Sequence, residues 1–318
     1  MMMKIEDFYT YINAQETSQF YLYSCYKGRM EDAEAKSYQN SSTFMYHIDH
    51  GLKFYENGQK ADQVVQPVLY FYGMVHLLKA WLLTNRPDYP ESTTLLAHGV
   101  TTRKRKKKQY SFMEDEVKLQ QHGLFPYFTE HLFSIKQFKF EKIRMELLFA
   151  SIPEMSAFFS LQKMEKMIPI GSVDSLFLQF PIQLLDNYHL TDKAFIRRIE
   201  GYLPAIKEIK MSNSYLSIHL DKVLNFSHGP FLIHMHNNKI YFPAHRDDFL
   251  LIPEVVSHYL ILFNLSMLCR YEAEWWGDLL LSRPDIDYPF IMQFLKTTSE
   301  KIPYLLGNAL MDKTIISS

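Results

Sequence analysis

The most constraining feature of the sequence is a long helical pattern with apolar side chains around most of its circumference. One face has apolar residues at steps of four, three, four, three and four: Val64, Val68, Phe71, Val75, Leu78 and Leu82. Other faces carry Leu69, Leu77 and Trp81. A helix that is apolar nearly all round belongs in a core rather than on a surface. The pattern therefore predicts a core helix that begins near Pro67 and ends before Pro87.

Further helical patterns lie on both sides of this segment. Upstream, residues 8–26 and 33–54 have helical spacing, and the second of these helices is expected to end near Gly58. Beyond Pro253 the helical period returns on two stripes, formed by Val256, Leu260, Phe263 and Met267 and by Val255, Tyr259, Leu262 and Cys269. A helix with two apolar stripes needs cover on two sides, and the remaining tail is too short to supply it alone. We therefore expect the C-terminal helices to pack against the N-terminal ones.

Residues 168–249 have a different sequence pattern. Short apolar runs there are broken by Gly, Pro and Asn, as is typical of strands. The sharpest prediction is a β-hairpin over residues 231–242, in which Asn237 and Asn238 suit a two-residue turn that requires positive φ. A helix over residues 192–200 is expected to interrupt the sheet. Farther upstream, residues 116–128 are expected to form a short hairpin that turns at His122 and Gly123.

Together these patterns predict an α+β fold with a mainly α-helical body and a smaller antiparallel β-containing insertion. Residues 1–166 are expected to form an N-terminal helical region that carries a basic loop at residues 98–110. Residues 167–250 are expected to contain the β-strands. Residues 251–318 are expected to form a C-terminal helical region that packs on the N-terminal helices.

Composition restricts where the protein works and what it attracts. The 34 Lys and Arg residues nearly balance the 35 Asp and Glu residues, so the molecule as a whole has no charge that would attract nucleic acid or a membrane. Its two cysteines, Cys25 and Cys269, are far apart in the sequence and suit a reducing cytoplasm. Glu6 and Asp7 stand where a secretory signal needs an apolar core, and no apolar window is long enough for a span. A cytoplasmic protein without a membrane partner is expected.

The glycines exclude the common phosphate-binding motifs. The two closest of the eleven glycines are seven residues apart, so neither G-x-G-x-x-G nor a P-loop is present. There is no G-x-S-x-G motif, and neither cysteine lies in a catalytic signature. The sequence thus predicts no cofactor, and the catalytic residues, if there are any, are unknown.

Histidines suggest a metal site only weakly. Five of the thirteen fall in one part of the sequence: His219, His228, His234, His236 and His245. His234 and His236 would point to the same side of a strand and could share a metal ion. Asp221, Asp247 and Asp248 are the only nearby carboxylates, and an exposed sheet face explains the histidines equally well. We therefore predict no metal.

A nuclease pattern can also be written into the sequence. Asp88 follows Pro87, and Glu116, Val117 and Lys118 complete a PD…ExK pattern in which carboxylates would hold Mg²⁺. The same triplet recurs at residues 34–36 and 208–210 by chance, so the specificity is poor. A nucleotide- or nucleic-acid-processing enzyme of this nuclease-like kind stays the alternative function.

The strongest local feature is a run of six consecutive cations, here called the cationic run: Arg103, Lys104, Arg105, Lys106, Lys107 and Lys108. Such a block is either solvated or meets a polyanion. Three interpretations stay open. The run is a solvated segment partly balanced by residues 114–116, or it docks on an acidic protein surface. Alternatively it forms a phosphate or nucleotide site, to which His98, Thr101 and Thr102 would add neutral donors.

A second cluster contains Arg270, Trp275 and Trp276. Adjacent helical residues diverge by about 100°, so both indoles enter one core only if they lie between packed elements. Otherwise one of them lies at an interface, where Trp and Arg are enriched. Both interpretations stay open, and the three residues are candidate interface residues.

Several long strings in the chain resemble the YaaC-like protein family of bacilli and their relatives. They are QPVLYFYGMVHLLKAWLLT, LLAHGVTTRKRKK with the following DEVKLQ, HYLILFNLSMLCRYEAEWW, and KIPYLL. The resemblance supplies no catalytic mechanism. It implies a bacterial cytoplasmic protein, and because members are often encoded beside IMP dehydrogenase, it makes that enzyme the candidate protein partner.

The resulting expectation is a cytoplasmic interaction or regulatory protein, linked to purine nucleotide metabolism through IMP dehydrogenase. It would use the basic loop to recognise a phosphate group or a protein partner. A nucleotide or another polyanion is the candidate ligand, and a second copy of the chain is a further candidate partner.

Overall fold

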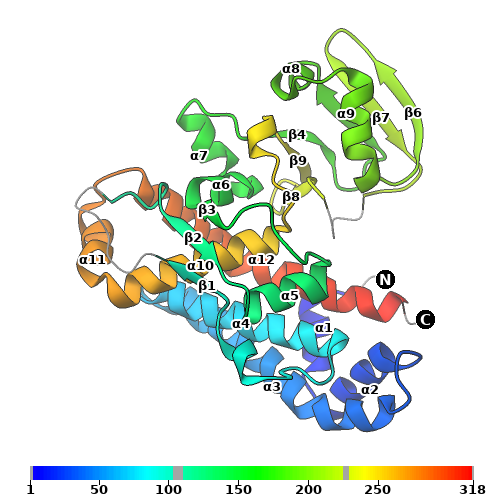
Figure 1. Ribbon diagram of the computed structural model, residues 1–318, viewed down its shortest axis with the longest axis vertical. Coiled ribbons are helices and arrows are strands. Elements are labelled where there is room, and N and C mark those ends of the chain that lie inside the picture. Colours follow the sequence, from blue (N-terminus) through cyan, green and yellow to red (C-terminus); the bar gives the residue numbers. More distant parts are fainter. Residues whose placement is uncertain (1–2, 103–109, 225–228, 317–318) are drawn as a thin grey trace. The chain divides into compact units, whose positions relative to one another are not determined.

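The computed structural model describes residues 3–102, 110–224 and 229–316. Figure 1 shows a mainly helical chain with small antiparallel sheets, which confirms the predicted α+β class. Two compact units divide it: residues 1–145 with 258–318 form unit 1, and residues 146–257 form unit 2. Within the described ranges, no helix is both long enough and apolar enough to cross a membrane.

The centre of unit 1 is a pair of helices, α3 (Ala33–Lys60) and α4 (Gln66–Asn85). Helix α4 is the predicted core helix. Glycines let the two helices approach closely: a Cβ at Gly51 would lie 2.7 Å from Leu77, and one at Gly73 would lie 2.8 Å from Tyr55. The expected end of α3 near Gly58 is confirmed, since the helix ends at Lys60; Gly58 itself is buried against the ring of Tyr70 and permits close packing.

Two shorter helices, α1 (Ile5–Ile12) and α2 (Gln15–Tyr26), precede this pair. They were expected to be one helix, but the backbone of Ala14 is extended. Hydroxyl groups replace the missing helical hydrogen bonds, since Ser18 Oγ donates to the carbonyl oxygen of Ile12 and Thr17 Oγ1 to that of Tyr11. The backbone carbonyl groups at the break between α1 and α2 therefore find hydrogen-bond donors nearby in the sequence.

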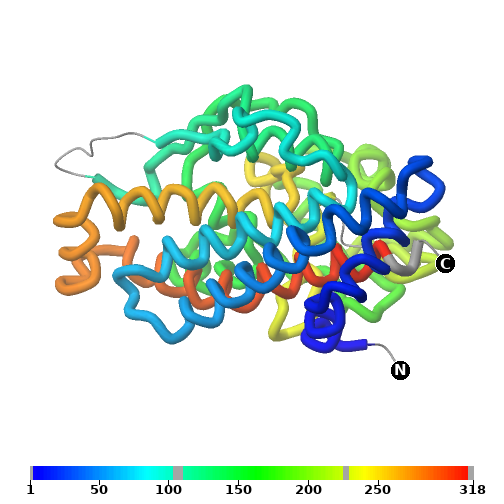
Figure 2. The backbone as a smooth tube through the Cα atoms, turned by 90° about the horizontal axis from the view of Figure 1, so that it is seen from below, coloured from blue at the N-terminus to red at the C-terminus, as the bar shows by residue number. Residues whose placement is uncertain are grey.

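The C-terminal helices of unit 1 are α10 (Glu254–Tyr271), α11 (Ala273–Ser282) and α12 (Asp287–Ile316). Figure 2 shows α3, α4 and α10 running side by side. The ring of Phe71 in α4 lies 5.4 Å from that of Tyr259 and 5.7 Å from that of Phe263, both in α10. These aromatic contacts cover one side of the core helix.

Helix α12 contains Pro303, which lacks an N–H and cannot bond the carbonyl of Ser299 four residues earlier. Gln59 of α3 donates instead to that carbonyl, at 3.3 Å. Tyr9 of α1 donates its hydroxyl to the carbonyl of Pro303, at 2.8 Å. The proline is thus accommodated by side chains from two other helices.

Unit 1 also contains a small antiparallel sheet of β1 (Val100–Thr102), β2 (Glu116–Leu119) and β3 (Lys142–Arg144), in that order. A 3-10 turn, η1 (Thr93–Leu96), precedes β1. The predicted hairpin over residues 116–128 is wrong, because the chain after β2 forms helix α5 (Leu124–Phe133). Gly123 has φ 119°, and Leu124 N–H donates to Ala97 O at 2.7 Å, which turns the chain into α5.

Unit 2 holds two further antiparallel sheets, ordered β4-β9-β8 and β5-β7-β6. Its elements are α6 (Met145–Ala150), η2 (Pro153–Met155), α7 (Ser156–Leu161), β4 (Met167–Ser172), β5 (Phe177–Pro181), α8 (Gln183–Tyr188), α9 (Asp192–Ile199), η3 (Glu200–Tyr202), β6 (Ile206–Met211), β7 (Tyr215–Leu220), β8 (Leu232–His234), β9 (Lys239–Pro243) and η4 (Arg246–Asp248). Phe180, Phe195 and Phe242 meet edge-on in its core, 5.3–5.8 Å apart. Helix α9 confirms the predicted helix and is capped by Thr191, whose hydroxyl accepts from Ala194 N–H at 3.3 Å.

The predicted hairpin in unit 2 is confirmed as β8 and β9, but its turn differs. His234 pairs with Lys239, so residues 235–238 form a four-residue turn, in which Asn238 has φ 55°. Asn tolerates this left-handed conformation better than most residues. His236 therefore lies in the turn, and the expectation that His234 and His236 share one strand is wrong.

Candidate functional site

The cationic run of residues 103–108 lies outside the described residues, but the segments before and after it are described. Strand β1 leads into the run. Thr101 is exposed and accepts a hydrogen bond from Gln120 Nε2 at 3.2 Å, whereas Thr102 is half-buried and pairs with Val117 of β2. The two predicted threonine donors therefore alternate between the faces of a short strand.

After the run, the chain returns at Tyr110, whose ring contacts Trp275 of α11 edge-on with centroids 5.0 Å apart. Tyr110 donates its hydroxyl to Asp115 Oδ2 at 2.7 Å, and Asn264 of α10 donates to the same oxygen at 2.9 Å. Burial, together with the negative charge of Asp115, raises the pKa of Tyr110. The phenol thus stays protonated and holds the returning chain on α10 and α11.

The next residues are held by the first residue of α12. Asp287 is buried, and its carboxylate accepts hydrogen bonds from Phe112 N–H at 2.5 Å, Met113 N–H at 3.1 Å and Ser111 Oγ at 3.3 Å. Burial raises the pKa of Asp287, and the two backbone donors oppose that shift. One carboxylate therefore fixes three consecutive residues of the returning chain, and we call residues 110–113 the return segment.

The two adjacent tryptophans have different surroundings. Trp276 is 2% exposed, and its Nε1–H donates to the carbonyl of Val64, just before α4, at 3.1 Å. Trp275 is half-buried and contacts Tyr110. The structure thus brings Trp275 to the return segment, whereas Trp276 belongs to the core.

Arg270, at the end of α10, is exposed beside these residues in the sequence. Its Nε donates to Ser266 O at 2.8 Å, and its guanidinium lies over the ring of Tyr271, 5.2 Å from the centroid. Tyr271 is 67% exposed. Together they form an exposed cation–aromatic pair of the kind found at interfaces.

His98 has an aromatic rather than a polar environment. Its ring lies 5.0 Å from Phe71 and 5.7 Å from Phe263, and its carbonyl accepts hydrogen bonds from Tyr259 Oη and Phe125 N–H. Burial lowers the pKa of His98, and the charges of Arg270 and Lys79 lower it further. His98 is therefore neutral near pH 7.

A second group of cationic and imidazole side chains, which no sequence pattern predicts, lies on α3 and α4. We call His47, His50, His76 and Lys79 the imidazole face. His47 Nδ1 and His76 Nδ1 are 2.9 Å apart, and the rings of His50 and His76 meet edge-on at 5.4 Å. In the sequence, His47 and His50 look like residues of an ordinary helix surface, because His76 approaches them only in the folded helix pair.

The surroundings of His47 and His76 keep these two imidazoles neutral near pH 7. Burial, with smaller contributions from the charges of His76 and Lys79, lowers the pKa of His47 to about 3. Burial and the charge of Lys79 lower the pKa of His76 to about 4. Burial also lowers the pKa of Lys79 itself.

The residues of the nuclease pattern have separate partners. Asp88 pairs with Lys36 of α3 at 2.5 Å, and Glu116 with Lys142 of β3 at 3.9 Å. Among the described side chains, no group of three or more His, Cys, Asp or Glu residues is arranged so that it could hold a metal ion.

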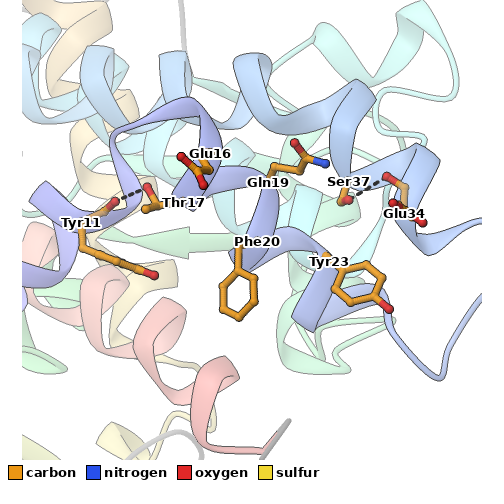
Figure 3. Close-up of a pocket in the computed structure, with 8 residues that line it drawn as sticks. All are labelled: Tyr11, Glu16, Thr17, Gln19, Phe20, Tyr23, Glu34 and Ser37. Atoms are coloured by element: carbon orange, nitrogen blue, oxygen red, sulfur yellow. Dashed lines mark hydrogen bonds between the residues drawn. The ribbon is translucent and has the colours of Figure 1, made fainter.

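A cavity of about 610 Å³ lies at the N-terminal helices, away from the residues that the sequence singled out (Figure 3). Its lining residues come from α1, α2 and α3: Tyr11, Glu16, Thr17, Gln19, Phe20, Tyr23, Glu34 and Ser37. Phe20 is 65% exposed at its rim. The cavity has aromatic rings and two carboxylates but no cationic side chain in its lining.

Comparison with known proteins gives one family match. The family described as YaaC-like Protein matches residues 10–310, which span both units. No curated protein and no solved structure matches the chain.

Proposed function

This chain belongs to the YaaC-like protein family, and from that premise we propose that it is an interaction or regulatory protein that uses its basic loop as the contact. The loop would recognise an acidic protein surface or a phosphate group through the cationic run. Arg270 and Trp275 would extend the contact.

The observation that carries the proposal is the contact between Tyr110 and Trp275 at 5.0 Å. It joins Tyr110, two residues after the cationic run, to the tryptophan pair, more than 160 residues away in the sequence. A binding segment whose ends are fixed loses less conformational entropy on association. The hydrogen bonds of Asp287 to residues 111–113 fix one end in this way.

The carboxylates nearest the return segment support recognition rather than catalysis. Asp115 accepts from Tyr110 and Asn264, and Asp287 accepts from the backbone of Phe112 and Met113. Their oxygens therefore hold the fold together, whereas a metal-dependent nuclease needs carboxylates that hold Mg²⁺. The exposed pair of Arg270 and Tyr271 at the end of α10 suits a protein interface.

We propose IMP dehydrogenase as the protein partner, because the family resemblance points to it. The test measures association and dissociation rates between the purified whole chain and purified IMP dehydrogenase, with and without nucleotide. Replacing Arg103, Arg105 and Lys107 with Ala should slow association and flatten its dependence on salt, because charges at an interface rim chiefly raise the association rate.

The matched control replaces three exposed lysines of unit 2, Lys193, Lys207 and Lys222, with Ala. This variant loses the same charge and should bind like the natural chain. Trp275→Ala should dissociate faster. Equal effects of the two triple variants would refute the role of the cationic run, and no complex at micromolar concentrations in either condition would remove IMP dehydrogenase as the partner.

A further inference from the structure

The imidazole face carries the positive charge of Lys79 in a partly buried position. Lys79 is half-buried on α4, and burial is the cause that lowers its pKa. No ion pair between described side chains involves it. Removing an ammonium group from water without a partner is costly, so an anion beside Lys79 would be stabilised there.

The imidazoles beside Lys79 supply neutral hydrogen-bond donors. The 2.9 Å contact between His47 Nδ1 and His76 Nδ1 is a hydrogen bond, so one ring donates and the other accepts. A neutral imidazole has a single N–H, and the accepting ring must therefore carry its hydrogen on Nε2. The pair thus retains one donor that is not used between the two rings.

Aromatic rings continue the same surface. Phe54 of α3 stacks on His76 with centroids 5.7 Å apart and an interplanar angle of 17°, and Tyr72 lies 6.3 Å from Phe54. Both aromatic side chains are half-buried. His76 and Lys79 are about one helical turn apart on α4, so the stacked rings and the ammonium group border the same stretch of surface.

We propose that the imidazole face, together with Phe54, binds a small phosphorylated compound that carries a planar ring, as a nucleoside monophosphate does. Lys79 and the histidines bind the phosphate group, and the planar ring stacks beside Phe54. Base stacking on aromatic side chains and Arg or Lys contacts to phosphate are two of the ways in which proteins hold such ligands. This site is separate from the basic loop and does not depend on the function proposed above.

Calorimetry on the whole chain tests the site with three probes: adenosine 5′-monophosphate, inorganic sulfate and adenosine. The monophosphate should bind more tightly than sulfate or adenosine, because it satisfies both parts of the site. Lys79→Met should weaken binding of the monophosphate and of sulfate about tenfold or more, the usual effect of losing a charged hydrogen bond. Phe54→Ala should weaken binding of the monophosphate but leave that of sulfate unchanged.

The matched control is Lys118→Met, which removes an exposed lysine from β2 in the same unit. Circular dichroism and thermal unfolding establish that each variant is folded. Equal affinities of the Lys79→Met and Lys118→Met variants, or no binding of the monophosphate at millimolar concentration, would overturn the proposal.

Discussion

Replacing His47 tests whether this half-buried histidine of α3 is held neutral in the folded chain. Burial lowers the pKa of His47 from 6.5 to about 3 in the folded chain, and unfolding restores the ordinary value. Below about pH 6.5 the unfolded state therefore binds a proton that the folded state does not, so stability falls as the pH falls from about 6.5 towards 3. Between pH 7 and pH 5, this one histidine should remove about 2 kcal/mol from the free energy of unfolding.

His47→Gln removes the titrating group and keeps a polar side chain. The variant should lose about 2 kcal/mol less stability than the natural chain between pH 7 and pH 5. Urea unfolding followed by tryptophan fluorescence measures this difference. All three tryptophans, Trp81, Trp275 and Trp276, belong to unit 1, so the signal reports the unit that contains His47.

The control is His122→Gln, which changes an exposed histidine in the same unit. Its pH dependence should match that of the natural chain. If His47→Gln loses as much stability between pH 7 and pH 5 as the natural chain does, then the histidine is not held neutral by burial, and the reasoning is refuted.

Three further predictions concern packing and the return segment. Gly73→Ala should cost about 1–3 kcal/mol in urea unfolding, because its methyl group would lie 2.8 Å from the ring of Tyr55; an unchanged stability would contradict the close approach of α3 and α4. Trp276→Ala should cost about 3–5 kcal/mol in the same assay, as expected of a large core residue, and Trp275→Ala should cost less; equal losses would contradict their different burial. Asp287→Ala should speed amide hydrogen exchange at Phe112 and Met113, since both lose their acceptor, and unchanged exchange would show that the carboxylate does not hold the return segment.

The sequence predicts the fold best where one face of an element is apolar over several turns. Helix α4 was predicted because its apolar period extends over residues 64–82. The end of α3 near Gly58 was predicted, but the packing of Gly58 against Tyr70 was not, because a glycine that permits close packing looks, in sequence, like one that permits a turn. The pairing of β2 with β1 and β3 was missed because those strands are short, and only tertiary contacts define them.

The sequence likewise predicts only part of the candidate site. The cationic run was recognised because its residues are consecutive in the sequence. The contacts that hold the return segment join Tyr110 to Trp275 and Phe112 to Asp287. Each pair is more than 160 residues apart in the sequence, so no local pattern predicts the contact. The pair of His47 and His76 was missed for the same reason, since each histidine alone resembles an ordinary helical residue.

Unit 1 is assembled from two separated stretches of chain, and this has a consequence for synthesis on the ribosome. Helix α12 receives hydrogen bonds from α1 and α2, through Tyr9 to Pro303 and Tyr21 to Leu310. Residues 146–257 must be translated before those partners exist, which takes roughly 5–20 s at ordinary elongation rates. During this time the N-terminal helices lack their C-terminal partners, and their apolar surface is exposed to water. Chaperones bind such surface. Unit 2 consists of one contiguous stretch of chain and can fold during this time. It can therefore complete its fold before unit 1, although the synthesis of unit 1 begins first.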